Sequence, residues 1–93
     1  MYRLQPTRRF DKSLEKLPKR VRERVLEAVE ELRERPFLGK PLRGLPLRVR
    51  PDLKVTPRSL RVGNYRVIYA VDPLSRTVYL LLVRHRKHVY EEL

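Results

Sequence analysis

A net charge of +12 on 93 residues, from 23 Lys and Arg against 11 Asp and Glu, predicts a protein that attracts polyanions. The residues are 41% hydrophobic, enough for one modest core, so separate binding and catalytic domains are excluded and we expect a single domain over residues 1–93. Cysteine is absent, which excludes disulfides, thiolate zinc sites and cysteine nucleophiles.

The N-terminal half is predicted to form a strand and two helices. Residues 2–5 favour a short strand that ends at Pro6, and Thr7 is a suitable N-cap for the helix that follows. That helix has apolar residues at i, i+4 and i+7: Phe10, Leu14 and Leu17. Pro18 separates it from a second helix, which ends near Pro36. The second helix carries one apolar stripe, typical of a core-facing helix: Val21, Val25, Ala28, Val29 and Leu32.

Residues 36–57 contain five prolines and are predicted to form a loop with one short edge strand around residues 45–50. This loop and the segment after it carry charge of one sign. Between residues 40 and 66 there is one acid, Asp52, against eight basic residues: Lys40, Arg43, Arg48, Arg50, Lys54, Arg58, Arg61 and Arg66. A merely solvating, heat-adapted surface is the alternative, but such surfaces mix the two signs, so we favour an anion-binding face.

The C-terminal half is predicted to be a set of antiparallel strands. Two β-rich runs at residues 59–62 and 65–71 flank the Gly-Asn pair at residues 63–64, which predicts a hairpin with a two-residue turn. Residues 72–75 form a second turn, and the almost wholly apolar residues 77–83 predict a strand inside the sheet. We expect a short terminal helix to follow.

The order of these elements is strand, helix, helix, and then three or four strands. This order predicts an α+β fold with an N-terminal strand and a two-helix hairpin packed on one face of a mostly antiparallel sheet of three to four strands. The other face of the sheet remains for binding.

The hairpin places two arginines together. If residues 63–64 are the two turn residues, Val62 pairs with Tyr65, and Arg61 then lies opposite Arg66 on the same face. Like charges directly across two strands destabilise the pair, and arginine stays protonated. An anion such as a phosphate between the two would explain the arrangement. The alternatives are that both guanidinium groups extend into solvent or that one pairs with a carboxylate.

A family resemblance appears at the same place. Residues 60–69, with the sequence LRVGNYRVIY, resemble the hairpin core of RelE/ParE-superfamily toxins. Residues 42–44 (LRG) resemble the Leu-x-Gly that follows the second helix in that family. Residues 85–86 (HR) and 89–90 (VY) resemble its closing His-Arg…Val-Tyr pattern. Together these matches span most of the chain.

The resemblance implies an mRNA interferase, which is a metal-independent endoribonuclease that often cuts mRNA in the ribosomal decoding site. In such enzymes a ribose 2′-OH attacks its own 3′ phosphate, so the enzyme supplies a base, an acid and positive charge but no nucleophile. We therefore expect no cofactor. We also expect no metal site, because few carboxylates and no thiols accompany the two histidines.

By the same resemblance, Arg66 matches the arginine that contacts the scissile phosphate, and Arg86 matches a C-terminal arginine with a similar task. Arg61 would add charge at the phosphate. Tyr90 matches the tyrosine that orients or deprotonates the 2′-OH in some members, which requires nearby cations to lower its pKa from the usual value of about 10. His88 is the alternative acid or base.

Further contacts to RNA are expected from six basic residues: Lys54, Arg58, Arg48, Arg50, Arg84 and Lys87. One departure from the family stands out. The RelE type has a Lys-x-Lys pair before the hairpin arginines, and its two positions fall at Pro57 and Ser59 here. Arg58 and Lys54 are candidates to replace the pair, although strand alternation turns Arg58 to the other face unless a bulge intervenes.

Two other functions remain open: a ParE-type toxin that inhibits DNA gyrase, and an inactive basic RNA- or ribosome-binding protein. A toxin also implies a partner, so we expect a cognate antitoxin whose acidic or amphipathic tail docks on the basic face and in grooves beside the helices, giving a hetero-oligomer. No apolar segment follows the N-terminus and the longest apolar run is residues 78–83, so we expect a cytoplasmic protein without a signal peptide or membrane contact.

Overall fold

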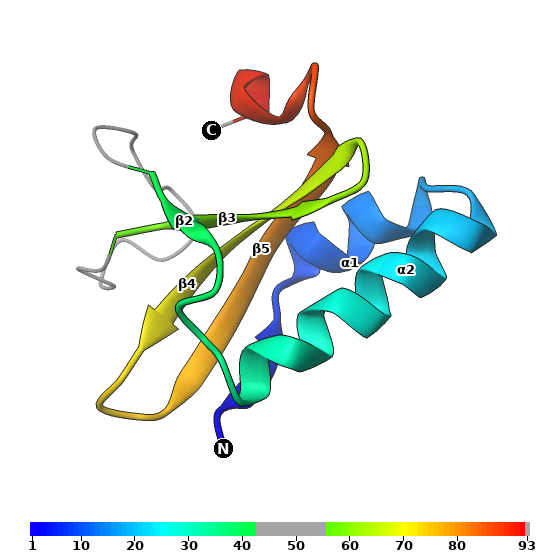
Figure 1. Ribbon diagram of the computed structural model, residues 1–93. Coiled ribbons are helices and arrows are strands. Elements are labelled where there is room, and N and C mark those ends of the chain that lie inside the picture. Colours follow the sequence, from blue (N-terminus) through cyan, green and yellow to red (C-terminus); the bar gives the residue numbers. More distant parts are fainter. Residues whose placement is uncertain (43–55, 93) are drawn as a thin grey trace.

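The computed structural model describes residues 1–42 and 56–92, apart from the side chains of Tyr90 and Glu92, and the strand expected around residues 45–50 lies outside this part. The elements follow the expected order (Figure 1): β1 (Arg3–Pro6), α1 (Arg8–Glu15), α2 (Lys19–Glu30), the 3-10 helix η1 (Glu31–Arg33), β2 (Lys40–Pro41), β3 (Arg58–Val62), β4 (Tyr65–Asp72), β5 (Thr77–His85) and the 3-10 helix η2 (Val89–Glu92). Within the described ranges, no helix has the length and apolar character to cross a membrane.

In the part of the chain that the structure describes, the strands form one mixed sheet of five strands in the order β1-β5-β4-β3-β2. The α+β class and the largely antiparallel sheet are confirmed, but the expected number of three to four strands was too low. β1 joins the sheet by pairing in parallel with β5, and β2 adds two residues beside β3. Because β2 is only two residues long, the sequence shows no alternation of apolar and polar residues from which it could have been predicted. Both added strands lie at edges, where Pro6 and Pro41 are tolerated because an edge residue need not donate to the ladder.

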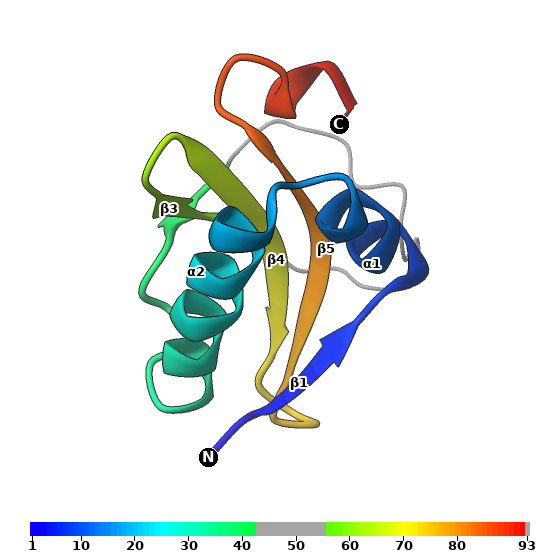
Figure 2. The same cartoon turned by 90° about the vertical axis from the view of Figure 1, so that its right-hand side faces the viewer.

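The two helices lie on the same face of the sheet, as Figures 1 and 2 show. The apolar stripe expected for the second helix is confirmed as core, since Val25 of α2 and Leu32 of η1 are fully buried and Val29 of α2 is nearly so. These side chains pack with Phe10 of α1 against one set of strand residues: Leu60, Val62, Val67, Tyr69, Val71, Val78, Leu80 and Val83. Hydrophobic burial at this interface therefore fixes which way β3, β4 and β5 face.

The strand β5 changes register in its middle. Tyr69 pairs with Leu80, whereas Ile68 pairs with Leu82, so Leu81 is an extra residue opposite β4. Such a β-bulge reverses which side chains face the helices. Leu80 and Val83 accordingly both pack on the helix side, while Leu81 and Leu82 both belong to a second apolar cluster on the opposite face.

The outer edge of β5 pairs with β1 as far as Leu80, and beyond that residue it contacts α1. The hydroxyl of Thr7 accepts a hydrogen bond from the Phe10 amide at 3.2 Å, which confirms the expected N-cap. The same hydroxyl donates to the Leu80 carbonyl at 2.9 Å. Further along, the Val83 amide donates to Ser13 Oγ at 3.1 Å. A side chain of α1 therefore satisfies the edge of β5 where β1 has ended, and this brings α1 beside the second half of β5 (Figure 2).

A second, smaller apolar cluster lies on the face of the sheet opposite α1 and α2. Ile68, Ala70, Leu81 and Leu82 meet the fully buried Val89 there. Val89 is the first residue of η2, so this contact fixes the short terminal helix, which was expected from the sequence, to the sheet. The C-terminal segment after β5 is thereby held on the helix-free face.

Candidate functional site

Three arginines occupy the same row of three neighbouring strands. Arg61 of β3 pairs with Arg66 of β4, which confirms the register predicted from the two-residue turn. Arg66 in turn pairs with Arg84 of β5. Directly paired residues project from the same face of a sheet, so these three side chains, here called the arginine row, share one face.

Strand alternation shows which face this is. Val62 and Val67, the neighbours of Arg61 and Arg66 along their strands, are buried in the helix-side core, and so is Val83 beside Arg84. The arginine row therefore projects from the face opposite α1 and α2. Arg61 is exposed, whereas Arg66 and Arg84 are half-buried.

The row concentrates charge that arginine cannot lose by deprotonation. The Arg61 Nε–H donates to the Gly63 carbonyl at 3.4 Å, a long contact that leaves the other guanidinium protons available. Like charges opposite each other on adjacent strands cost stability. A bound polyanion offsets that cost, because phosphate oxygens accept charge-assisted hydrogen bonds from guanidinium groups in a planar, two-pronged geometry.

The segment after β5 is tied to the tip of the hairpin. The Arg86 amide donates to the Asn64 carbonyl at 2.8 Å, and Gly63, beside Asn64, adopts the left-handed conformation (φ +58°) that the turn requires. Arg86 is exposed. Its backbone therefore stands beside the hairpin that carries Arg61 and Arg66, as expected if Arg86 serves the same site.

The two histidines occupy different environments. The His85 ring packs edge-on against Tyr65 with 5.3 Å between ring centroids, and His85 Nδ1 accepts a hydrogen bond from the Lys87 amide at 3.2 Å. His88 is exposed and its Nδ1 lies 3.4 Å from Oε2 of Glu91. His85 is thus a packing residue, while His88 is accessible to a ligand.

Tyr90 belongs to η2 and directly follows the anchoring residue Val89. Its side chain lies outside the described part of the structure. The same is true of three residues that were expected to bind RNA, Lys54, Arg48 and Arg50. For all four, the roles given above stay predictions.

Arg58 lies apart from the arginine row. It pairs with Tyr69 on the helix side of the sheet, as strand alternation without a bulge predicts for β3. Its guanidinium group donates to the carbonyls of Gly39 and Phe37 at 3.0 and 3.1 Å, and stacks over the Phe37 ring. Arg58 therefore fixes the segment that leads into β2, and we leave it out of the candidate RNA-binding set.

The same corner contains a buried tyrosine. The Tyr69 side chain is fully buried and its hydroxyl accepts a hydrogen bond from the Gly39 amide at 2.8 Å. Burial raises the pKa of Tyr69, although the hydrogen bond from Gly39 and the nearby Arg58 oppose the rise. Gly39 has no room for a side chain, because an added Cβ would lie 2.7 Å from both the Ser59 carbonyl and the Tyr69 hydroxyl.

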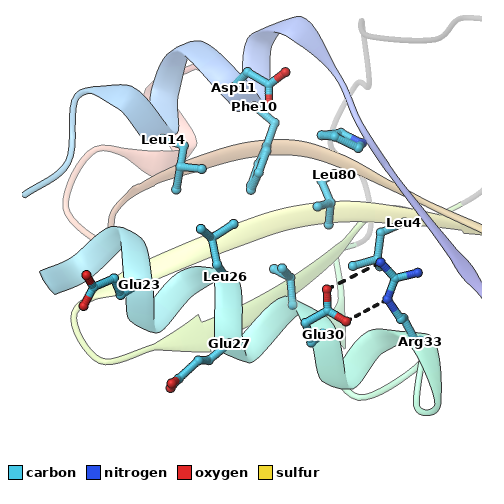
Figure 3. Close-up of a pocket in the computed structure, with 12 residues that line it drawn as sticks. Leu4, Phe10, Asp11, Leu14, Glu23, Leu26, Glu27, Glu30, Arg33 and Leu80 are labelled. Carbon is cyan, nitrogen blue, oxygen red and sulfur yellow. Dashed lines mark hydrogen bonds and ion pairs between the residues drawn. The ribbon is translucent and has the colours of Figure 1, made fainter. Parts of the chain in front are cut away.

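A groove of about 720 Å³ lies between β1, α1 and α2 (Figure 3). Its lining is mostly apolar and includes the half-exposed Leu26. Four carboxylates stand at its rim: Asp11, Glu23, Glu27 and Glu30. Glu30 pairs with Arg33 at 2.7 Å. This apolar groove differs in both polarity and charge from the arginine row, so the two surfaces suit different ligands.

The family model described as ParE toxin of type II toxin-antitoxin system, parDE, matches residues 4–90. The chain belongs to the RelE/ParE toxin family. Toxin RelG of Mycobacterium tuberculosis is 38% identical over 81 residues, which cover 85% of this chain and 84% of RelG. Family membership makes the protein a toxin of a type II toxin-antitoxin system.

Solved structures of the family have the same fold. The toxin-antitoxin complex RelBE2 from Mycobacterium tuberculosis matches with a TM-score of 0.70 and 34% identity, covering 91% of this chain and 98% of the matched one. The intact RelBE toxin-antitoxin complex from E. coli matches with a TM-score of 0.68 and 29% identity, covering 91% and 96%. Both are complexes of a toxin with its antitoxin.

Proposed function

We propose that this toxin is a metal-independent endoribonuclease that cleaves mRNA at the ribosome. The observation that carries the proposal is the arginine row, in which three permanent cations from three strands project from one face. A single phosphodiester can contact more than one of them, because neighbouring strands are only about 4.8 Å apart. The protein would act in the cytoplasm, where mRNA is translated.

The reaction needs no nucleophile from the protein, because RNA carries its own 2′-OH. A base removes the 2′-OH proton, and the 2′ oxygen forms a bond to the adjacent phosphorus. The bond from phosphorus to the 5′ oxygen of the next nucleotide breaks, and an acid protonates that oxygen. The products are a 2′,3′-cyclic phosphate and a free 5′-OH.

We assign the charge stabilisation to Arg66, Arg61 and Arg86. The pentacoordinate phosphorane gains negative charge as the bond to the 2′ oxygen forms, and preorganised cations stabilise it more than the ground state. Proton transfer falls to His88 or Tyr90 at the C-terminal end of the same face. His88 is exposed, and its ring lies beside Glu91. Both residues follow β5 and are sequence neighbours of Val89, whose anchoring to the sheet would bring them to the substrate.

The partner is proposed to be a cognate antitoxin, in keeping with the solved complexes of the relatives. The apolar groove is a suitable seat for part of it. Because the groove has an acidic rim on a protein of charge +12, we expect its occupant to be an amphipathic segment with apolar anchors and basic flanks. An acidic segment of the same partner would neutralise the arginine row.

The test uses purified toxin with ribosomes that carry a defined mRNA. We expect cleavage to give fragments with 5′-OH ends, and a single 2′-deoxyribose at the cut position to abolish it. The variant with Arg66→Ala and Arg86→Ala should lose cleavage and growth arrest, whereas Arg20→Ala with Arg35→Ala, an equal charge change at exposed residues of the α2 side, should retain both. Growth arrest by the first variant at the wild-type level would contradict the proposal.

A second candidate is inhibition of DNA gyrase by binding. It is favoured by the description of the matched family model as ParE toxin and by Ser59, which stands where the RelE type has a lysine and is only 5% exposed. A supercoiling assay with gyrase decides between the two. Relaxed plasmid that stays relaxed in the presence of the toxin, together with intact mRNA, would favour this candidate.

A further inference from the structure

A second groove, of about 460 Å³, lies between α1 and the second half of β5. Five of its lining side chains are cationic: Arg8, Arg9, Lys12, Lys16 and Arg84. The other described residues of the lining are Ser13 and Leu82, so the described part of the lining contains one apolar residue and no carboxylate. We call it the α1 groove. Its chemistry is the opposite of the apolar groove on the other side of α1.

The helix α1 separates its charges by face. Arg8, Lys12 and Lys16 follow each other at intervals of four and line the α1 groove. The two acids of the helix point elsewhere, since Asp11 lines the apolar groove and Glu15 lines a third groove, of about 410 Å³, beside α2. Like charges four residues apart destabilise a helix. Among the residues that the structure describes, Arg8, Lys12 and Lys16 make no ion pair that would offset this cost.

The α1 groove is continuous with the arginine row through a shared residue. Arg84 is the third member of the row and also lines the groove. The hydrogen bond from the Val83 amide to Ser13 Oγ holds α1 against β5 at this point. Positive charge therefore runs from β3 across β4 and β5 and onto α1. Neither the arginine row nor the described lining of the α1 groove contains an acid.

We propose that the α1 groove is a second phosphate-binding site, which receives the backbone of single-stranded RNA as it leaves the arginine row over the edge of β5. The inference rests on the proposed function, since the row is taken to hold the scissile phosphate. The bound strand thus lies across the strands of the sheet, and nucleotides on one side of the cut contact α1. Sequence is not read in this groove, because phosphate contacts position a strand without distinguishing its bases.

An acidic protein segment is the competing ligand. A peptide that folds on binding needs apolar anchors to offset its loss of conformational entropy. Among the described residues that line the α1 groove, Leu82 alone is apolar. The apolar groove supplies such anchors, whereas the α1 groove supplies point charges on long, adaptable side chains. Lysine ammonium groups suit a phosphate chain of variable conformation. The lining therefore favours RNA.

The experiment measures binding rather than cleavage. The probes are 2′-O-methyl oligoribonucleotides of increasing length, which keep the phosphates and cannot be cut. The variant is Lys12→Ala with Lys16→Ala, and the matched control is Lys19→Ala with Arg22→Ala, which removes the same charge from the third groove, beside α2. The affinity of each protein for each probe is followed as a function of salt concentration.

We expect the variant to bind long probes at least tenfold more weakly than the control does, with equal affinity for probes too short to leave the row. The slope of log affinity against log salt should fall in magnitude by about 0.7 for each lost phosphate contact. Equal effects of variant and control, or an effect independent of probe length, would overturn the inference. A further result would also overturn it: the wild-type protein binds an oligo-glutamate peptide more tightly than RNA, and the variant loses this peptide binding. The α1 groove would then be a site for an acidic protein segment.

This outcome is separate from the fate of the nuclease proposal. Arg66→Ala is assayed for cleavage of an ordinary mRNA in parallel. Full cleavage by Arg66→Ala would count against the proposed function even if the α1 groove binds the probes as expected. If Arg66→Ala loses cleavage while the variant with Lys12→Ala and Lys16→Ala binds the probes as the wild type does, the inference about the α1 groove fails and the nuclease proposal stands.

Discussion

Arg66 lies directly opposite Arg84 across the ladder between β4 and β5, although both side chains carry permanent positive charge. Arg61 continues the same row on β3. A sheet selected only for stability would place an acid or an apolar residue at one of these positions. We therefore expect substitutions here to separate stability from function.

Arg61→Gln is the first such substitution. Removing one charge from the row should leave the free energy of unfolding unchanged or raise it by about 0.2–1 kcal/mol, the usual range for a cross-strand pair. Affinity for a non-cleavable RNA should fall at the same time. Urea unfolding and RNA titration on the same samples measure both. A clear loss of stability would show that Arg61 is needed for the fold.

Two residues, His88 and Tyr90, are candidates for the proton-transfer step, and substitutions can decide between them. His88→Gln and Tyr90→Phe each remove a candidate acid or base, and we expect one of them to lower kcat by about 10²–10⁴, the usual contribution of general acid–base catalysis. The other should lower it by less than tenfold. Single-turnover cleavage of mRNA on ribosomes is the measurement. Small effects of both substitutions would mean that neither group transfers the proton.

Gly39 is a position where packing leaves no choice of residue. Gly39→Ala should lower the free energy of unfolding by about 1–3 kcal/mol, because its Cβ would overlap the Ser59 carbonyl and the Tyr69 hydroxyl. Leu74→Ala is the control, since Leu74 is 98% exposed and should change little. Chemical denaturation measures both variants. Wild-type stability in Gly39→Ala would mean that Ser59 and Tyr69 can move away from Gly39 far enough to accept a Cβ.

The fold should also lose stability at alkaline pH through Tyr69. Because burial raises the pKa of Tyr69 in the folded protein, the neutral phenol stabilises the fold fully below the unfolded pKa of about 10. That contribution declines as the pH rises through the higher folded pKa. Absorbance titration of the five tyrosines should show one that ionises late, and Tyr69→Phe should remove it. Five tyrosines that titrate together near pH 10 would contradict this.

The apolar groove gives a prediction about the antitoxin. Leu26 is 47% exposed and lines the groove (Figure 3), so Leu26→Ser should weaken antitoxin binding by about 1–3 kcal/mol, as loss of a buried apolar anchor does. Cleavage of RNA by the free toxin should not change. The matched control is Leu74→Ser, at an exposed leucine in the turn between β4 and β5. If Leu26→Ser and Leu74→Ser bind the antitoxin with equal affinity in a co-purification titration, the apolar groove is not part of the interface.

Local chemistry made some of these relationships predictable from the sequence. The two-residue turn at Gly63 and Asn64 was enough to predict that Arg61 faces Arg66, because turn length fixes hairpin register. The apolar stripe of α2 predicted the helix side of the core, and Thr7 predicted the start of α1. In each case the deciding residues lie within a few positions of one another.

Other relationships depend on distant residues. The pairing of Arg66 with Arg84 requires the extra residue Leu81, since without the bulge Arg66 would face Val83 and Arg84 would turn to the helix side. Three leucines in succession at residues 80–82 give no alternation from which a bulge could be detected. The basic face of α1 was missed for a different reason. Its charges were visible, but their alignment with β5 depends on the contact between Ser13 and Val83.

The parallel pairing of β1 with β5 has a consequence for the order of assembly. Arg3 and Thr77 are neighbours in the sheet but lie 74 residues apart in the chain. During synthesis, β1 cannot find its partner until β5 has emerged, and closing so long a loop is slow. Arg84 and Arg86 emerge later still. Until β5 and Arg86 have both been made, the nascent chain therefore holds neither a finished sheet nor a finished set of cations.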